Sequence, residues 1–321
     1  MEIDLMNEIA CKCIHEWGAM VTADREILLN SRANARILID ERVNSGMTID
    51  LKKGIESIVR QELEDEACLN VLLKWACLQR GDSLIEIFNG AEFVGWQGTF
   101  RRIAVSFMSM DSMGIIAVKM DGVIFLSETE KRYGEHDSRW DEEEPFYEGF
   151  SKFKMTQIMV RSELVNSSMN ETIPLFVGSS VEALTKQKQS NTIHKAAKFW
   201  KKNGKDGAIF RNLNCLLRCD LTDLKWIIFG ARDNDFILSK TKTRGRDEFE
   251  ELINGVEKMY LRLFDILKGI KRFLNEVDVS SCVVEFPVDT EEGTVIQITE
   301  ATASETNGLL TQQFKQRFNI E

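Results

Sequence analysis

The sequence predicts an α+β protein: a helical N-terminal module, residues 1–82, followed by a domain rich in antiparallel sheet, residues 83–321. Two observations predict this class. Apolar residues recur at helical spacing up to residue 80, and after Gly81-Asp82 they form short runs between turn residues. The 43% hydrophobic content also supplies a core, which excludes a disordered chain.

Helical spacing predicts three helices in the N-terminal module. The first covers residues 5–17, the second covers residues 23–43, and the third follows Thr48-Ile-Asp and extends to Trp75. In the first of these, apolar residues follow one another at steps of four: Leu5, Ile9, Cys13 and Trp17.

Short apolar runs bounded by turn residues predict the strands of the second domain. They cover residues 84–88, 93–96, 103–107, 115–118, 123–126, 157–165, 173–177, 224–229, 236–239, 282–286 and 294–298. One long helix, residues 247–275, interrupts this series. The mixture indicates an α+β domain with much antiparallel sheet.

Composition excludes several classes of protein. No stretch of about 18 apolar residues is present, so we expect no membrane span. The N-terminus is acidic and lacks a signal-peptide pattern. The seven cysteines are scattered and odd in number, which is not typical of a disulfide framework. An intracellular protein with reduced thiols, cytoplasmic or nuclear, is the expectation.

The sharpest local motif surrounds a lysine at the end of an apolar strand. Lys119 follows Ile115-Ile-Ala-Val, and Asp121-Gly122 then predicts a turn into the next strand. A lysine whose ammonium group is desolvated or surrounded by other cations can lose its proton and act as a nucleophile.

An ordered series of further motifs follows this lysine. They are Arg132 in Lys-Arg-Tyr-Gly, Glu163 in Val-Arg-Ser-Glu-Leu-Val, Phe176 in Ile-Pro-Leu-Phe-Val, Glu292 in Glu-Glu-Gly-Thr, and Lys315 with Arg317 in Phe-Lys-Gln-Arg-Phe. The series resembles that of the covalent nucleotidyltransferases, and most of all that of the small ATP-dependent RNA ligases. The resemblance covers roughly residues 90–321.

The resemblance implies a ligase adenylation domain with ATP and Mg²⁺ as cofactors. Lys119 would attack the α-phosphate of ATP, and the resulting lysyl-AMP would serve to join 3′-hydroxyl and 5′-phosphate ends of RNA. Glu163 would hold the ribose and Phe176 would stack on the adenine. Glu292 would place the metal ion, and Arg132 would contact a phosphate. Lys315 and Arg317, alternating on a strand, would bind phosphates on one face.

A basic stretch stands out against the overall charge of −10. Residues 185–246 contain 15 Lys and Arg and five acids, a net charge of +10. Cations and aromatic residues alternate there, which suits phosphate contact and base stacking. The candidate contacts to RNA or DNA strand ends are Lys198, Trp200, Lys201, Lys202 and Arg211. The alternative is a solvated surface with Phe199 and Trp200 in the core.

Three other functions remain open at this level. The first is an mRNA-capping type of guanylyltransferase, which would use GTP on Lys119. The second is a degenerate ATP-grasp enzyme, in which Glu285 and Glu300 would bind the metal and Arg211 is part of the resemblance. The third is an inactive relative that binds nucleic acid or a protein partner through residues 185–246 or the N-terminal module.

Overall fold

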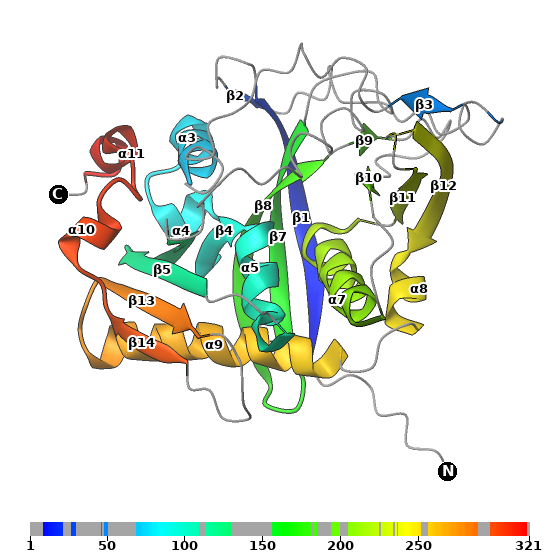
Figure 1. Cartoon of the computed structure of the whole chain (residues 1–321). Coiled ribbons are helices and arrows are strands. Elements are labelled where there is room, and N and C mark those ends of the chain that lie inside the picture. Colours follow the sequence, from blue (N-terminus) through cyan, green and yellow to red (C-terminus); the bar gives the residue numbers. More distant parts are fainter. Residues whose placement is uncertain are drawn as a thin grey trace.

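The computed structural model describes residues 9–21, 27–29, 46, 48–50, 69–108, 113–129, 156–181, 183–184, 194–199, 205–224, 226–233, 235, 237–251, 256–287 and 296–319. Within these residues the strands form two sheets, and helices cover both faces of the larger one (Figure 1). The molecule is therefore a mixed α+β protein, as predicted.

The large sheet has nine strands, and only its centre contains parallel neighbours. β4 lies parallel to β6 and β8, while every other pair is antiparallel. In spatial order the strands are β14 (Gln297–Glu300), β13 (Ser281–Phe286), β5 (Met113–Met120), β6 (Val123–Glu128), β4 (Phe93–Trp96), β8 (Glu171–Val181), β7 (Thr156–Asn166), β1 (Ile9–Val21) and β2 (Ile27–Leu29).

Two hydrophobic clusters lie on opposite faces of this sheet. The face covered by α5 (Gln97–Ala104), α7 (Lys205–Thr222) and α9 (Val256–Glu276) is called the α9 face. The face covered by α3 (Asn70–Leu78), α4 (Leu84–Ile87) and α11 (Gln312–Arg317) is called the α3 face. α9 runs across the strands at the bottom of Figure 1. The remaining helices are η2 (Ser106–Met108), α8 (Arg246–Glu251) and α10 (Ala303–Thr306).

The small sheet has five strands and lies beside β1 and α7 (Figure 1). Its order is β3 (Ile49–Asp50), β12 (Ile237–Gly245), β11 (Trp226–Arg232), β10 (His194–Phe199) and β9 (Ala183–Leu184). β10 and β11 are parallel, and the other pairs are antiparallel. The basic stretch of the sequence supplies three of these strands, β10 to β12.

The predicted helical N-terminal module is wrong. The segment predicted as the first helix forms the 13-residue strand β1, which pairs with β7 from Ile9 to Met20. A step of four, as from Ile9 to Cys13, also fits one face of a strand, but a β-bulge between Cys13 and His15 turns Trp17 to the other face. Of the third predicted helix, α3 is the part that forms among the described residues. The predicted boundary at residue 82 separates β1 from its partner β7.

Two short runs predicted as strands are helices instead. Residues 84–88 contain α4, whose first turn is capped by the Ser83 hydroxyl accepting from the Glu86 amide. Residues 103–107 lie at the end of α5 and in η2. In α5 the buried residues Phe100, Ile103 and Ala104 follow helical spacing.

The other predicted strands all overlap observed ones. The Asp121-Gly122 turn also forms, with φ of 44° and 81°, which is the left-handed conformation of a tight hairpin. The predicted long helix corresponds to α8 and α9. No helix among the described residues is long and apolar enough to cross a membrane.

Candidate nucleic-acid interface

A row of cations follows one face of β12. Lys240, Lys242 and Arg244 alternate along the strand, so their side chains leave the sheet on the same side. Both lysines are exposed and Arg244 is half-buried. Across the ladder they pair with Ala231, Phe229 and Ile227 of β11. We call Lys240, Lys242 and Arg244 the β12 cations.

An aromatic ring lies among these charges. Phe229 is half-buried, and the Arg244 guanidinium lies 5.6 Å from the centroid of its ring. Lys242 is directly opposite Phe229 in the ladder. Cations beside a partly exposed ring are the combination that contacts phosphates and stacks on bases.

The predicted nucleic-acid residues are placed only in part. Lys198 lies in β10 and is the register partner of Phe229. Arg211 lies half-buried in α7. Trp200, Lys201 and Lys202 lie outside the described residues. The β12 cations belong to the same basic stretch but were not singled out, although their period-two spacing identifies one strand face.

The β7–β8 hairpin lies between β4 and β1 in the large sheet, and aromatic side chains fill its α3 face. Phe176 is fully buried, with its ring centroid 5.0 Å from those of Trp75 and Phe88 and 5.6 Å from that of Trp17. Phe176 is therefore enclosed by other rings and has no exposed surface on which a purine could stack.

Gly178 lies two residues further along the same face. A Cβ atom built there would lie 2.8 Å from the ring of Trp96 and 2.9 Å from Leu72. Real Cβ contacts are essentially never that short. The packing of α3 and Trp96 against β8 thus requires glycine and leaves no room for a longer side chain.

Glu163 is the one acid of β7, and positive groups surround it. Arg161, two residues earlier, lies within 3.4 Å of its carboxylate. The Arg161 side chain is buried and also donates hydrogen bonds to the carbonyls of Asn89 and Ser162. Lys12 of β1 is directly opposite Glu163 in the ladder. A cross-strand pair places the two Cβ atoms about 5 Å apart.

The other face of the hairpin packs against α7 and α9. Leu164, Leu175 and Val177 are fully buried there, and the hydroxyl of Ser162 donates to the carbonyl of Leu221 in α7 at 2.9 Å. Arg218, one turn before Leu221, is only 2% exposed. Both faces of the hairpin centre are therefore packed.

The predicted site residues that the structure describes do not meet in one place. Lys119 points to the α9 face, where its ammonium group donates to the amide oxygen of Asn275 at 2.7 Å. Glu163 and Phe176 belong to the opposite face. Lys315 and Arg317 lie on α11, which packs on the α3 face.

One detail of the predicted site needs correction. The last two cations lie on a helix and not on alternate positions of a strand, and Arg317 donates to the carbonyl of Gly81 at 2.8 Å. Arg132 and Glu292 lie outside the described residues.

A shallow cavity of about 400 Å³ lies between α9 and the starts of β4 and β8. Its floor is apolar, with Phe93 and Ile173 among its lining residues, and its rim carries charges. Both lysines of this rim are paired: Lys268 with Glu171 at 2.6 Å, and Lys271 with Glu92 at 2.8 Å. The pairing distinguishes these lysines from the β12 cations.

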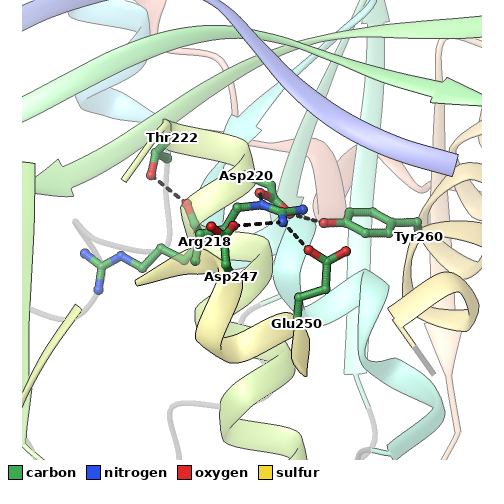
Figure 2. Close-up of polar contacts among 7 residues, drawn as sticks. Arg218, Asp220, Thr222, Asp247, Glu250 and Tyr260 are labelled. Atoms are coloured by element: carbon green, nitrogen blue, oxygen red, sulfur yellow. Dashed lines mark hydrogen bonds and ion pairs between the residues drawn. The ribbon is translucent and has the colours of Figure 1, made fainter. Parts of the chain in front are cut away.

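A buried polar network joins α7, α8 and α9 (Figure 2). Asp220 accepts hydrogen bonds from the Tyr260 hydroxyl and from Arg246, and Arg246 also contacts Glu250. Burial raises the pKa of Asp220, while the bonds from Arg246 and Tyr260 oppose the rise. Because Arg246 is on α8 and Tyr260 is on α9, Asp220 of α7 connects the three helices.

Residues 12–174 match the family of RAI1-like PD-(D/E)XK nucleases, and this segment is more than half of the chain. The chain belongs to this family. No curated protein matches in the sequence comparison. Membership in the RAI1-like family overturns the resemblance to nucleotidyltransferases, so RNA ligation, lysyl-AMP formation and capping guanylyltransferase activity are wrong predictions.

Solved structures agree with this assignment at the level of the fold. Rai1 of Scheffersomyces stipitis, with (3′-NADP)⁺ and calcium, shares 14% identity at a TM-score of 0.69, covering 97% of this chain and 96% of that one. Rai1 of Candida albicans, with pU5 and Mn²⁺, shares 13% at 0.66, covering 99% and 100%. K. lactis Dxo1, with manganese, shares 12% at 0.63, covering 91% and 90%.

Membership in this family implies a divalent metal ion, which needs suitable ligands among the residues of this chain. The family is named for Asp or Glu, any residue, then Lys, and the chain contains that triplet twice, at residues 50–52 and 223–225. Asp50 ends β3 of the small sheet, and Asp223 lies in the turn after α7. Among the described residues no group of three His, Cys, Asp or Glu could hold a metal ion. The described residues of the large sheet therefore do not fit the metal.

Proposed function

We propose that the protein binds RNA, with the β12 cations contacting the phosphates of the strand. The observation that carries this proposal is the alternation of Lys240, Lys242 and Arg244 on one face beside Phe229. Successive phosphates follow an RNA strand as a row of negative charges, and a row of cations along a strand matches it.

Family relatives support the choice of RNA. The structure of the C. albicans relative is in complex with pU5, and that of the S. stipitis relative is in complex with (3′-NADP)⁺, a nucleotide ligand. We therefore expect a single-stranded RNA with a 5′-phosphate to be the ligand class. The predicted contacts Lys198, Trp200, Lys201, Lys202 and Arg211 remain part of this proposal.

The test measures the affinity for a fluorescent 5′-phosphorylated oligouridylate by anisotropy at several salt concentrations. The double variant Lys240→Gln/Lys242→Gln removes two phosphate contacts. The slope of log K against log salt should become shallower by roughly 1.4, since each contact on a single strand contributes about 0.7.

A matched control variant, Lys268→Gln/Lys271→Gln, removes the same charge from α9. Its lysines are already paired with Glu171 and Glu92, so its slope should equal that of the wild type. Equal slopes for all three proteins, or no binding by any, would reject the proposal.

Hydrolysis of RNA is the second candidate function, because the family is one of nucleases. It is tested by following the length of the same oligouridylate on a gel in the presence of Mn²⁺.

A further inference from the structure

The β7–β8 hairpin of the large sheet carries residues that disfavour the binding of a divalent metal ion. A metal centre for phosphodiester hydrolysis needs several oxygen ligands, usually carboxylates, facing one open position. β7 and β8 together contain two acids, Glu163 and Glu171. Glu171 is at the far end of the hairpin and is paired with Lys268. Only Glu163 is near the centre.

The charges around Glu163 are those of an ion pair and not of a metal site. Arg161 is held in place by the carbonyls of Asn89 and Ser162, and Lys12 faces Glu163 from β1. A divalent cation at the Glu163 carboxylate would have two positive side chains as neighbours. Coulomb repulsion from both would weaken its binding.

Neighbouring positions offer neither a ligand nor space. On the α3 face the hairpin carries Phe176 and Gly178, and aromatic rings occupy the volume above them. On the α9 face it carries Ser162, Leu164 and Val177 beneath α7, whose Arg218 is itself buried. At Phe176, Gly178 and Ser162 a substrate phosphate therefore has no open approach to the hairpin. The Glu163 side chain is 32% exposed, and there the ion pair with Arg161 opposes a metal ion.

We infer that this chain binds RNA without cleaving it, because the described residues of the β7–β8 hairpin form packing contacts and ion pairs and do not supply the carboxylate ligands of a metal centre. The inference rests on the proposed RNA binding. In this inference the nuclease fold holds the RNA strand and leaves its phosphodiester bonds intact.

The experiment uses the full chain and a 5′-phosphorylated, 3′-fluorescent oligouridylate. Anisotropy measures binding in EDTA and in Mn²⁺, a gel measures RNA length, and the electron paramagnetic resonance signal of free Mn²⁺ measures metal binding without reference to activity. We expect equal anisotropy in both buffers, no loss of full-length RNA, and no loss of the free Mn²⁺ signal when protein is added.

The other outcomes distinguish the inference of no cleavage from the proposal of RNA binding. RNA shortening that requires Mn²⁺ and follows the protein through gel filtration overturns the inference but leaves RNA binding in place. A loss of the free Mn²⁺ signal that Glu163→Gln abolishes also overturns it, because Glu163 would then be a ligand. Absence of any anisotropy change rejects the RNA-binding proposal, while the Mn²⁺ signal still decides whether the hairpin binds metal.

Discussion

Inner strands of the two sheets present opposite surfaces. In the large sheet, β7 and β8 are packed on both faces, and the charged groups Arg161 and Glu163 are paired with each other. In the small sheet, β12 presents two exposed lysines and a half-buried arginine beside Phe229. Substitutions in the large sheet should therefore change stability and leave RNA binding unchanged, while substitutions of the β12 cations should act mainly on RNA binding.

The largest expected effect is on stability, from Phe176→Ala. Removal of a fully buried ring packed against Trp75 and Phe88 should lower the free energy of unfolding by about 3–5 kcal/mol. Urea unfolding measures the loss. The affinity of the folded protein for oligouridylate should not change.

Phe210→Ala is the control for that substitution, since Phe210 is 38% exposed on α7 and should change stability by only about 0.5 kcal/mol. A Phe176→Ala protein of wild-type stability would show that the α3 face of the hairpin is not closed. A ligand could then reach the α3 face of the hairpin at Phe176.

A second effect on stability is expected from the Asp220 network. Asp220→Ala leaves the buried Tyr260 hydroxyl without its acceptor, which should cost about 1–3 kcal/mol. Arg246 loses Asp220 but keeps Glu250. Chemical unfolding at neutral pH checks the value, and unchanged stability would indicate that the network carries no net energy.

The pH dependence of stability tests the same residue with Asp220→Asn, which cannot titrate. Burial raises the Asp220 pKa above 3.8, so the folded state holds this proton more tightly than the unfolded chain. The stabilisation that this proton gives to the folded state is complete below the pKa of Asp220 in the unfolded chain. It is lost as pH rises through the raised pKa of the folded state. Stability of wild type minus that of Asp220→Asn should fall from pH about 4 upward, and a rise would contradict the assignment.

Packing at Gly178 is tested by a pair of glycine substitutions. Gly178→Ala brings a Cβ atom to 2.8 Å from Trp96, so it should cost about 1–3 kcal/mol. Gly98→Ala, in α5 with no atom within 4 Å, should instead stabilise by up to about 1 kcal/mol through helix propensity. If Gly178→Ala were as stable as the wild type or more stable in thermal unfolding, Trp96 and Leu72 would have to move aside readily.

The sequence predicted the strands better than the helices, for a physical reason. Runs such as the one around Val160 and the Asp121-Gly122 turn carry local signals that tertiary contacts did not override. The spacing of Ile9, Cys13 and Trp17 fits a helix, and only the pairing with β7, with a β-bulge after Cys13, makes the segment a strand. At residues 84–88, the Ser83 cap outweighed an apolar run read as a strand.

The site was less predictable because motifs do not reveal which face of a sheet a residue occupies. Lys119 and Phe176 follow in the order typical of ligases, yet β5 and β8 direct them to opposite faces. The basic stretch, by contrast, was visible as net charge. Its distribution over three strands of one sheet depends on long-range pairing that composition does not contain.

The smallest expected effect separates charge from stacking at the β12 cations. Arg244→Lys keeps the positive charge but loses the planar group over Phe229, so it should lower stability by about 0.5 kcal/mol. The salt dependence of RNA binding should stay unchanged, because it counts charges. Arg244→Gln should instead lower both stability and the salt slope, the latter by about 0.7. If Arg244→Lys changed the slope as much as Arg244→Gln, the guanidinium fork and not its charge would be the RNA contact, and the row of β12 cations would not act as a simple electrostatic surface.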